Sequence, residues 1–297
     1  MTDTEAAPEV AIVIGASSGI GRATALRLAS RGARVVLVSR SRVPLEAAAT
    51  ACRATGAADV EVMVGDVNDR VALQRIVDVT VARWGRIDVV VHTATVMAYG
   101  TVEELPADVF ERVVDTAIHG TANVARAVLP TFRRQGRGSL IIVSSLLASI
   151  AAPTMGAYVT AKWGQLGLIR TLQLEVRDVP GIHISAVSPG GVNTPIYYQA
   201  ATVTGHTGRP PPLVYSPDRV AQAILGCVDR PRLLVQSGIA NPVIIAGFRL
   251  LPRVFNALVG PLLGVLAVRR DDVEATTGNV FEPLADTEAT EGPWRSV

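Results

Sequence analysis

A hydroxyl, a phenol and an amine are spaced in this sequence so that they could act on one point. Tyr158 and Lys162 are four residues apart, which places them on one face of a helix. Lys162 is also the only lysine, since every other residue in the Lys+Arg total of 28 is an arginine. An ammonium can sit beside a phenol, lower its pKa from about 10 and exchange protons, which a guanidinium cannot do. With Ser144 and Ser145 shortly before it, this pattern predicts a tyrosine acid/base.

The same spacing also arises by chance on amphipathic helices, with the phenol packed and the amine in solvent. The rest of the chain decides between the two interpretations, beginning with a glycine-rich turn near its start. Residues 10–14 are apolar, residues 15–21 read Gly-Ala-Ser-Ser-Gly-Ile-Gly, and residues 22–30 have helical periodicity. Glycines there let the backbone approach a ligand, and the first N–H groups of the helix would face a pyrophosphate. The turn therefore predicts a dinucleotide site.

The second apolar run, residues 34–38, ends in Ser39-Arg40-Ser41-Arg42. A turn that binds NAD is expected to have Asp or Glu about 20 residues after the glycines, where the carboxylate holds the ribose 2′-hydroxyl. No carboxylate stands here to repel a 2′-phosphate. The sequence therefore favours NADP(H) over NAD(H), with Arg40 as the main phosphate ligand and Ser39 or Arg42 as helpers. The alternative is that Arg40 and Arg42 are solvated loop charges.

Apolar runs alternate with helical segments along most of the chain. The further runs are residues 60–64, 87–91, 139–143, 182–187 and 232–236. The connections are long enough for parallel crossovers, which predicts a Rossmann-type, doubly wound α/β sheet of about seven parallel strands with a C-terminal helical extension. The polar turns all follow the carboxyl ends of strands, which is the edge where such sheets bind ligands.

Over residues 10–235 these segments resemble the short-chain dehydrogenase/reductase family, with four of its motifs in order. The resemblance implies hydride transfer with a nicotinamide cofactor, in which Ser145 polarises the substrate oxygen and Tyr158 exchanges its proton. Lys162 would hold the nicotinamide ribose and lower the pKa of the phenol. The number of residues between Ser145 and Tyr158 matches the family spacing, whereas that from Ser144 does not.

The resemblance and the turns together imply a larger set of cofactor-binding residues. These are Gly15, Ser17, Ser18, Gly19, Ile20 and Gly21 at the phosphates, Ser39 and Arg40 at the ribose 2′ position, Asp66 and Val67 at the adenine, Thr93 and Ala94 after the fourth strand, Tyr158 and Lys162, and Pro189, Gly190, Val192 and Thr194 at the nicotinamide. An alternative for Asp66 is that it caps the helix that follows it.

Two motifs depart from the family pattern. The fourth strand usually ends in Asn-Asn-Ala-Gly, and here it reads His-Thr-Ala-Thr, so that the β-branched Thr95 replaces glycine beside the cofactor and the local backbone path is expected to differ. On the long helix Ala117 replaces the asparagine that would connect Lys162 to a water chain. A proton relay could instead use water, His92 or His119, although packing or exposure at the surface is the simpler interpretation of each histidine.

Composition excludes several classes of protein. With 49% hydrophobic and 18% charged residues and a formal net charge of +2, the chain is neither disordered nor a nucleic-acid-binding protein. Cys52 and Cys227 are far apart, which predicts no disulfide and no metal site. The flexible, acidic residues 1–9 lack a signal-peptide pattern, so the expected location is the cytoplasm.

Residues 238–297 form an apolar helical extension and a polar tail beyond the dehydrogenase domain of residues 10–237. The uncharged runs in residues 241–270 are too short for the about 20 residues that span a bilayer. Three interpretations remain: a cover over the substrate, a subunit contact, or a membrane-peripheral segment whose arginines lie at headgroups, namely Arg249, Arg253, Arg269 and Arg270. A predicted lid, residues 195–215, adds Tyr197 and Tyr198 as aromatic walls.

The apolar lid and extension predict a lipophilic small-molecule substrate. The leading hypothesis is an NADP(H)-dependent oxidoreductase that interconverts a secondary alcohol and a ketone. The alternative is a dinucleotide-binding regulatory or scaffold protein that has lost catalysis; the changes at Thr93, Thr95 and Ala117 favour it, and the intact Ser145, Tyr158 and Lys162 oppose it. The resemblance further implies a homodimer or homotetramer built through the two long helices, here residues 106–134 and 155–178.

Overall fold

The computed structural model describes residues 7–266 and 271–297. Residues 1–6 of the predicted flexible N-terminus, and Arg269 and Arg270, lie outside the described residues. One sheet of seven parallel strands, in the order β3-β2-β1-β4-β6-β7-β9, forms the centre and confirms the predicted fold class. Its strands are β1 (Val10–Ile14), β2 (Arg34–Ser39), β3 (Asp59–Val64), β4 (Val89–His92), β6 (Gly138–Val143), β7 (Ile182–Pro189) and β9 (Leu234–Ser237).

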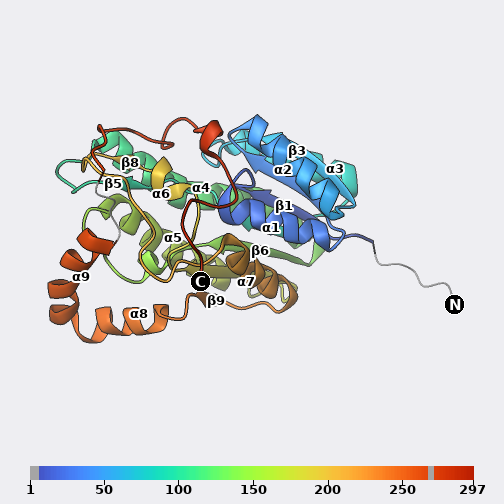
Figure 1. Ribbon diagram of the computed structural model, residues 1–297. Coiled ribbons are helices and arrows are strands. Elements are labelled where there is room, and N and C mark those ends of the chain that lie inside the picture. Colours follow the sequence, from blue (N-terminus) through green and yellow to red (C-terminus); the bar gives the residue numbers. More distant parts are fainter. Residues whose placement is uncertain (1–6, 267–270) are drawn as a thin grey trace.

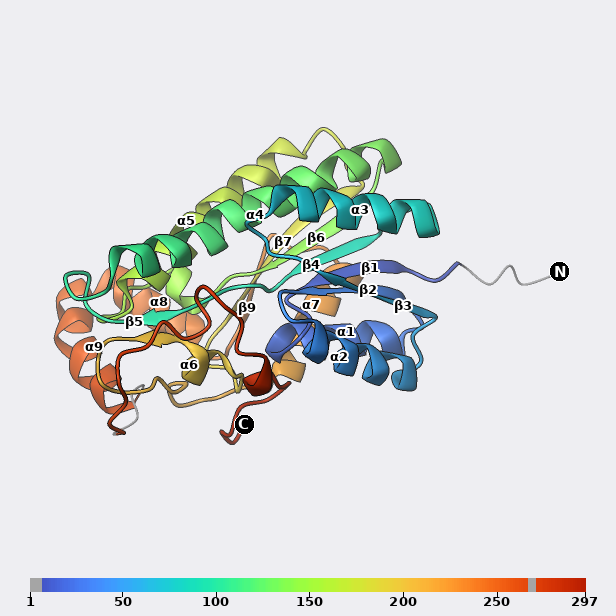
Figure 2. The ribbon, with the colours of Figure 1, turned by 90° about the horizontal axis from the view of Figure 1, so that it is seen from above.

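Helices cover both faces of this sheet, as Figures 1 and 2 show. One layer consists of α1 (Gly19–Ser30), α2 (Arg42–Thr55) and α7 (Pro217–Asp229). The opposite layer consists of α3 (Arg70–Trp84), α4 (Ala107–Gln135) and α5 (Gly156–Glu175). Successive residues of β1 enter different cores, with Val13 packed among the residues of the first layer and Ile14 among those of the second. This is why the strands read as continuous apolar runs rather than as alternating patterns.

The strand order places the ligand edge. The chain leaves β1 toward β2 on one side, and later returns to pair β4 with the other side of β1. The connections after β1 and β4 therefore diverge, and a crevice opens between them at the carboxyl ends. Strand β9 is the seventh strand, and it begins at Leu234 rather than at the predicted residue 232 because its pairing with β7 starts there.

Short elements and a helical hairpin surround this edge. They comprise the two-stranded pair β5 (Ala98–Tyr99) and β8 (Ala201–Thr202), the 3-10 turns η1 (Leu146–Ala148) and η2 (Ala285–Thr287), and helices α6 (Ile196–Gln199), α8 (Asn241–Leu250) and α9 (Pro252–Leu266). The apolar extension is thus two helices, broken at Leu251 where Pro252 begins the second. Among the described residues, no helix is both long and apolar enough to cross a bilayer.

Candidate active site

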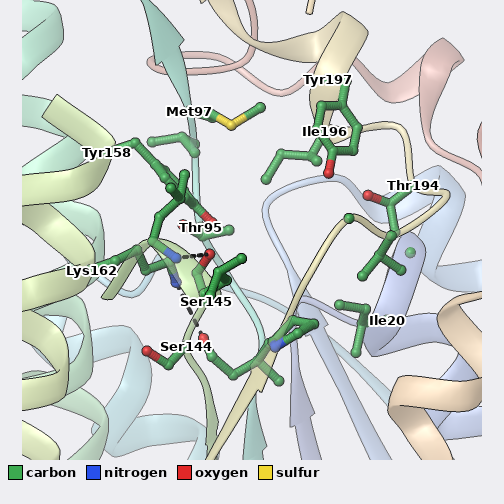
Figure 3. A pocket seen from close by; sticks show the side chains of 18 of the residues that line it. Ile20, Thr95, Met97, Ser144, Ser145, Tyr158, Lys162, Thr194, Ile196 and Tyr197 are labelled. Carbon is green, nitrogen blue, oxygen red and sulfur yellow. Dashed lines mark hydrogen bonds between the residues drawn. The ribbon is translucent and has the colours of Figure 1, made fainter. Parts of the chain in front are cut away.

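A cavity of about 600 Å³ lies at the carboxyl edge of the sheet. The residues predicted for catalysis and cofactor binding line it, from Gly15 in the first turn to Thr194 after β7, with one exception. Arg42, named as a possible helper at the 2′-phosphate, is exposed at the start of α2 and pairs with Glu46. Figure 3 shows Ser145, Tyr158 and Lys162 on one side of this space, and Ile20 and Thr194 across from them. The structure brings the predicted residues together, while their individual roles stay predictions.

Ser145 is the first residue after β6 whose side chain faces Tyr158. Its hydroxyl accepts a hydrogen bond from the N–H of Leu147 at 3.1 Å, which caps η1 and fixes the side chain. The same hydroxyl lies close enough to the Tyr158 phenol to lower its pKa. The hydroxyl of Ser144 is buried without a partner among the described residues, and Figure 3 shows it directed away from Tyr158. Ser145 is therefore the serine placed to act with Tyr158.

Helix α5 carries Tyr158 and Lys162 on its buried face, with the two side chains 8% and 1% exposed. The Lys162 ammonium lies 5.6 Å from the centre of the Tyr158 ring. It donates hydrogen bonds to the carbonyl oxygen of Val143, at 3.2 Å, and to Oε1 of Gln165, at 3.0 Å. The solvated lysine that chance spacing would give is therefore excluded.

Burial shifts both titrating groups. It lowers the pKa of Lys162 to about 7. It raises the pKa of Tyr158, against the opposing effect of the Ser145 hydroxyl. The sequence led us to expect a lowered phenol pKa, and this direction is wrong for the cavity as described, because loss of hydration outweighs the neighbouring groups. An ammonium that titrates near neutral pH remains suited to exchange protons with solvent.

Gln165 is a buried residue of this site that sequence reasoning missed. Its Nε2 donates to Oγ1 of Thr121 at 2.9 Å and to the carbonyl oxygen of Ala117 at 3.4 Å, while its Oε1 accepts from Lys162. The side chain thus ties the ammonium to α4 beside the position where the family asparagine is absent. A glutamine three residues after Lys162, on the buried face of the helix, was the available signal.

The two histidines named as alternative relays differ. His119 is exposed and pairs with Asp115, with 2.8 Å between Nδ1 and Oδ1, so it is a surface residue. His92 is buried at the end of β4, and neither ring nitrogen has a hydrogen-bond partner among the described residues. Burial, with a further contribution from Lys162, lowers the pKa of His92 to about 3. A histidine that stays neutral at pH 7 does not carry charge to the site.

The glycine turn is too close to its neighbours for side chains. Gly15 has φ +90°, and a Cβ there would collide with the hydroxyl of Thr93, which itself donates to the carbonyl oxygen of Ile14 at 2.9 Å. A Cβ at Gly21 would collide with the carbonyl oxygen of Gly15. Ser18 precedes α1 without making a capping side-chain bond. A bare backbone beside a helix N-terminus fits the pyrophosphate of a dinucleotide.

Arg40 does not have the free guanidinium that was expected of a ligand for a 2′-phosphate. Its guanidinium donates to three backbone carbonyl oxygens of the C-terminal tail: Asn279 at 2.6 Å, Phe281 at 3.1 Å and Val280 at 3.4 Å. Burial lowers its pKa. Arg40 is therefore no solvated loop charge, but in this structure it is bound to the tail.

Asp66 does not cap the helix after it. Its Oδ1 accepts from the N–H of Asn68 at 2.9 Å, and its Oδ2 accepts from Arg112 at 2.6 Å. The cap of α3 is Asp69, which accepts from the N–H groups of Val71 and Ala72. The capping alternative for Asp66 is thus wrong, because the helix begins three residues later than the turn suggests.

Residues of the predicted lid and of the hairpin of α8 and α9 form further walls of the cavity. Tyr197 lines the cavity and packs edge to face on Trp294 of the tail, with 5.3 Å between ring centres. Tyr198 also packs on Trp294, with 5.9 Å between ring centres, but it does not line the cavity. The side chains that the described part of the hairpin contributes are all apolar: Ile244, Leu251, Val254, Phe255, Leu258, Val259 and Leu262.

The two cysteines, both buried, are free. In residues 7–266 and 271–297 no group of histidine, cysteine or carboxylate side chains is arranged to hold a metal ion.

Comparison with known proteins identifies the family. Residues 9–202 match the model of the short chain dehydrogenases. An uncharacterized oxidoreductase of Listeria monocytogenes is 31% identical over 227 residues, which cover 75% of this chain and 91% of the relative. The 1-deoxy-11-beta-hydroxypentalenate dehydrogenase of Streptomyces avermitilis is 32% identical over 231 residues, covering 77% and 84%.

A solved structure gives the same result. The alcohol dehydrogenase from the archaeon Thermococcus sibiricus, complexed with 5-hydroxy-NADP, superposes with a TM-score of 0.67 at 27% identity and covers 77% of this chain and 94% of its own. The parallel sheet, the glycine turn and the serine, tyrosine and lysine of the cavity accord with these matches. The chain belongs to the short-chain dehydrogenase/reductase family of oxidoreductases.

Proposed function

We propose that this protein interconverts a secondary alcohol and a ketone with a nicotinamide dinucleotide as redox partner. The observation that carries the proposal is the convergence of Ser145, Tyr158 and Lys162 on one cavity whose far side is the glycine turn. One structural relative is named an alcohol dehydrogenase, and the relative from Streptomyces is named for an 11-beta-hydroxy compound.

A nicotinamide dinucleotide held at the glycine turn would supply or accept the hydride. In the reducing direction Tyr158 gives its hydroxyl proton to the substrate oxygen, and the Ser145 hydroxyl donates a hydrogen bond to the same oxygen as negative charge develops on it. Lys162 stabilises the tyrosinate that remains and returns a proton to it, since an ammonium with a pKa of about 7 can release one near neutral pH. Gln165 and the Val143 carbonyl hold the ammonium in place during this exchange.

We propose a lipophilic substrate. The walls that the lid and hairpin add are aliphatic and aromatic, and burying such surface in contact with a ligand contributes roughly 25 cal/mol per Å². The exposed apolar side chains of the hairpin further support a peripheral contact with a lipid surface. Assembly into a homodimer or homotetramer through α4 and α5 stays a prediction from the family resemblance.

The cofactor preference predicted from Ser39 and Arg40 is NADP(H). The 5-hydroxy-NADP of the archaeal relative supports this prediction, and the engagement of Arg40 by the tail opposes it. Either cofactor is consistent with the proposed reaction.

The test is the Tyr158→Phe variant, which removes the proton donor and keeps the ring. We expect turnover of ketones to fall by about 10²- to 10⁴-fold while cofactor binding stays within a factor of a few. Reduction would be followed by nicotinamide absorbance and binding by calorimetry. Unchanged turnover of a good substrate would show that the roles are assigned wrongly. Binding of cofactor without turnover of any alcohol or ketone by the unmodified protein would favour the regulatory alternative, which Ala117 supports.

A further inference from the structure

The C-terminal tail, residues 271–297, runs along the cofactor edge of the molecule. Asn279 donates from its N–H to the carbonyl oxygen of Gln199, at 2.8 Å, which ties the tail to the lid. Farther on, the carbonyl oxygen of Ala289 accepts from the N–H of Gly19, at 2.9 Å, at the start of α1. In Figures 1 and 2 this red segment passes over α6 and reaches η2 beside α2. The tail therefore borders the part of the cavity where the adenosine half of a dinucleotide belongs.

Glu288 brings a carboxylate to that place. Its Oε1 accepts a hydrogen bond from the Ser41 hydroxyl, at 3.0 Å, just after the end of β2. Its Oε2 is buried and has no hydrogen-bond partner among the described residues. Glu288 lines the same cavity as Ser39 and Arg40. One carboxylate oxygen is thus fixed by Ser41, and the other is buried beside the cavity without a hydrogen-bond partner among the described residues.

The cation that would bind a 2′-phosphate is already engaged. Arg40 donates to three carbonyl oxygens of residues 279–281, within the same tail that carries Glu288. A phosphate at this position would have to break these bonds and would also face the Glu288 carboxylate. Both effects oppose a second negative charge there.

A ribose with a free 2′-hydroxyl would be favoured at this site, where a 2′-phosphate is opposed. A carboxylate near the end of the second strand accepts hydrogen bonds from that hydroxyl, and this is how dinucleotide folds recognise NAD. Here the position after β2 holds no carboxylate, but the tail supplies one 247 positions later in the chain. We propose that Glu288 is the residue that binds the adenosine ribose and makes this protein select NAD(H) over NADP(H).

This inference rests on the proposed function, because it concerns the same cofactor site, and it reverses the preference predicted from the sequence. The C-terminal tail becomes part of the binding site: Arg40 holds the tail in position, and Glu288 accepts a hydrogen bond from the ribose 2′-hydroxyl. Selection of NAD(H) thus depends on residues outside the segment 9–202 that matches the family model.

The experiment measures binding of NADH and NADPH to the full chain by calorimetry. It compares the unmodified protein with Glu288→Gln and with Glu282→Gln, which removes the same charge from an exposed tail residue that does not line the cavity. Thermal melting of each variant establishes that it is folded.

We expect the unmodified protein to bind NADH at least about tenfold more tightly than NADPH. A tenfold ratio of affinities corresponds to about 1.4 kcal/mol, which repulsion between the Glu288 carboxylate and a 2′-phosphate can supply. Glu288→Gln should reduce this ratio about tenfold, mainly through tighter NADPH binding, whereas Glu282→Gln should leave it within a factor of about two.

A preference for NADPH that Glu288→Gln does not change would overturn the inference and leave the proposed function intact. Equal shifts in the two variants would also overturn it, because the effect would then come from the overall charge of the tail. If neither cofactor binds to the unmodified protein, both the inference and the proposed function fail.

Discussion

The Lys162 ammonium is held by the carbonyl oxygen of Val143 and by the side chain of Gln165. Where the family has an asparagine on the long helix, this chain has Ala117, and a buried glutamine on α5 spans the space instead. The Nε2 group of Gln165 donates to Thr121 and to the Ala117 carbonyl oxygen, which fixes the orientation of the amide. Its Oε1 then accepts a hydrogen bond from the Lys162 ammonium. The geometry makes Gln165 a positioning residue rather than a catalytic one.

Replacement of Gln165 by leucine, which has a similar volume, should test this role. The oxygen that stabilises the charged amine would be lost, so the pKa of Lys162 should fall further below about 7. Because a hydrogen bond to a charged group contributes about 1.5–3 kcal/mol, we expect the limb of the kcat–pH profile that reports Lys162 to move down by about one unit and kcat to fall about tenfold.

Gln173→Leu provides the control for this variant. Gln173 is the other buried glutamine on the same helix, and it donates to the carbonyl oxygens of Ile184 and Leu233, remote from the ammonium. Its loss should lower the melting temperature without moving the pH profile. If both variants change only stability, Gln165 is a packing residue and its proposed role is refuted.

At the scale of elements, the turns after the strands decide where each functional side chain lies. The turn after β3 has two aspartates with different tasks: Asp66 holds Arg112 beside the cavity, and Asp69 caps α3. Sequence alone could not separate them, because both residues stand before a helical pattern and both suit a cap.

Asp69→Ala should therefore lower the free energy of unfolding by about 1 kcal/mol, the usual cost of losing an N-cap, and should leave cofactor affinity unchanged. Asp66→Asn should have the converse effect, with a smaller loss of stability and weaker cofactor binding, since its carboxylate lies in the cavity wall. Urea unfolding and calorimetry measure the two quantities. Equal losses of stability in the two variants would show that Asp66 also caps the helix.

Most of the framework could be predicted because local signals and global architecture agree. The apolar runs were recognisable as buried parallel strands, and the glycine turn and the Tyr158 helix were recognisable from spacing that the chemistry itself requires. What sequence missed depends on contacts between distant segments. Glu288 meets Ser41 across 247 positions, and no periodicity or motif marks a tail glutamate as part of a cofactor site. Gln165 was missed for a related reason: its role depends on the absence of a polar side chain at Ala117, on another helix.

At the scale of the whole molecule, the hairpin of α8 and α9 has two apolar faces. On α8, Ile244, Gly247 and Leu251 at its end face the cavity. Val243 and Leu250, seven positions apart and so on one stripe, do not line the cavity and are 74% and 78% exposed. Residues 239–266 contain no acidic residue and two arginines, Arg249 and Arg253. An exposed apolar stripe with only positive charges beside it fits an anionic lipid surface.

Substituting both outer residues, Val243→Asp and Leu250→Asp, should therefore abolish flotation of the full chain with vesicles that contain phosphatidylglycerol, while turnover of a water-soluble ketone stays the same. The unmodified protein should float with these vesicles and less with pure phosphatidylcholine, because Arg249 and Arg253 add attraction to anionic headgroups.

The control is Val43→Asp with Val71→Asp, two equally exposed valines in the first turns of α2 and α3, where added carboxylates favour the helix. If the stripe instead covers a second copy of the chain, the unmodified protein will not float, and the outer-face variant will sediment as a smaller species.

A membrane-facing hairpin that also lines the cavity would give a lipophilic substrate a path from the bilayer to Tyr158 without crossing water. Loss of flotation should therefore raise KM for a membrane-partitioned ketone and leave kcat unchanged.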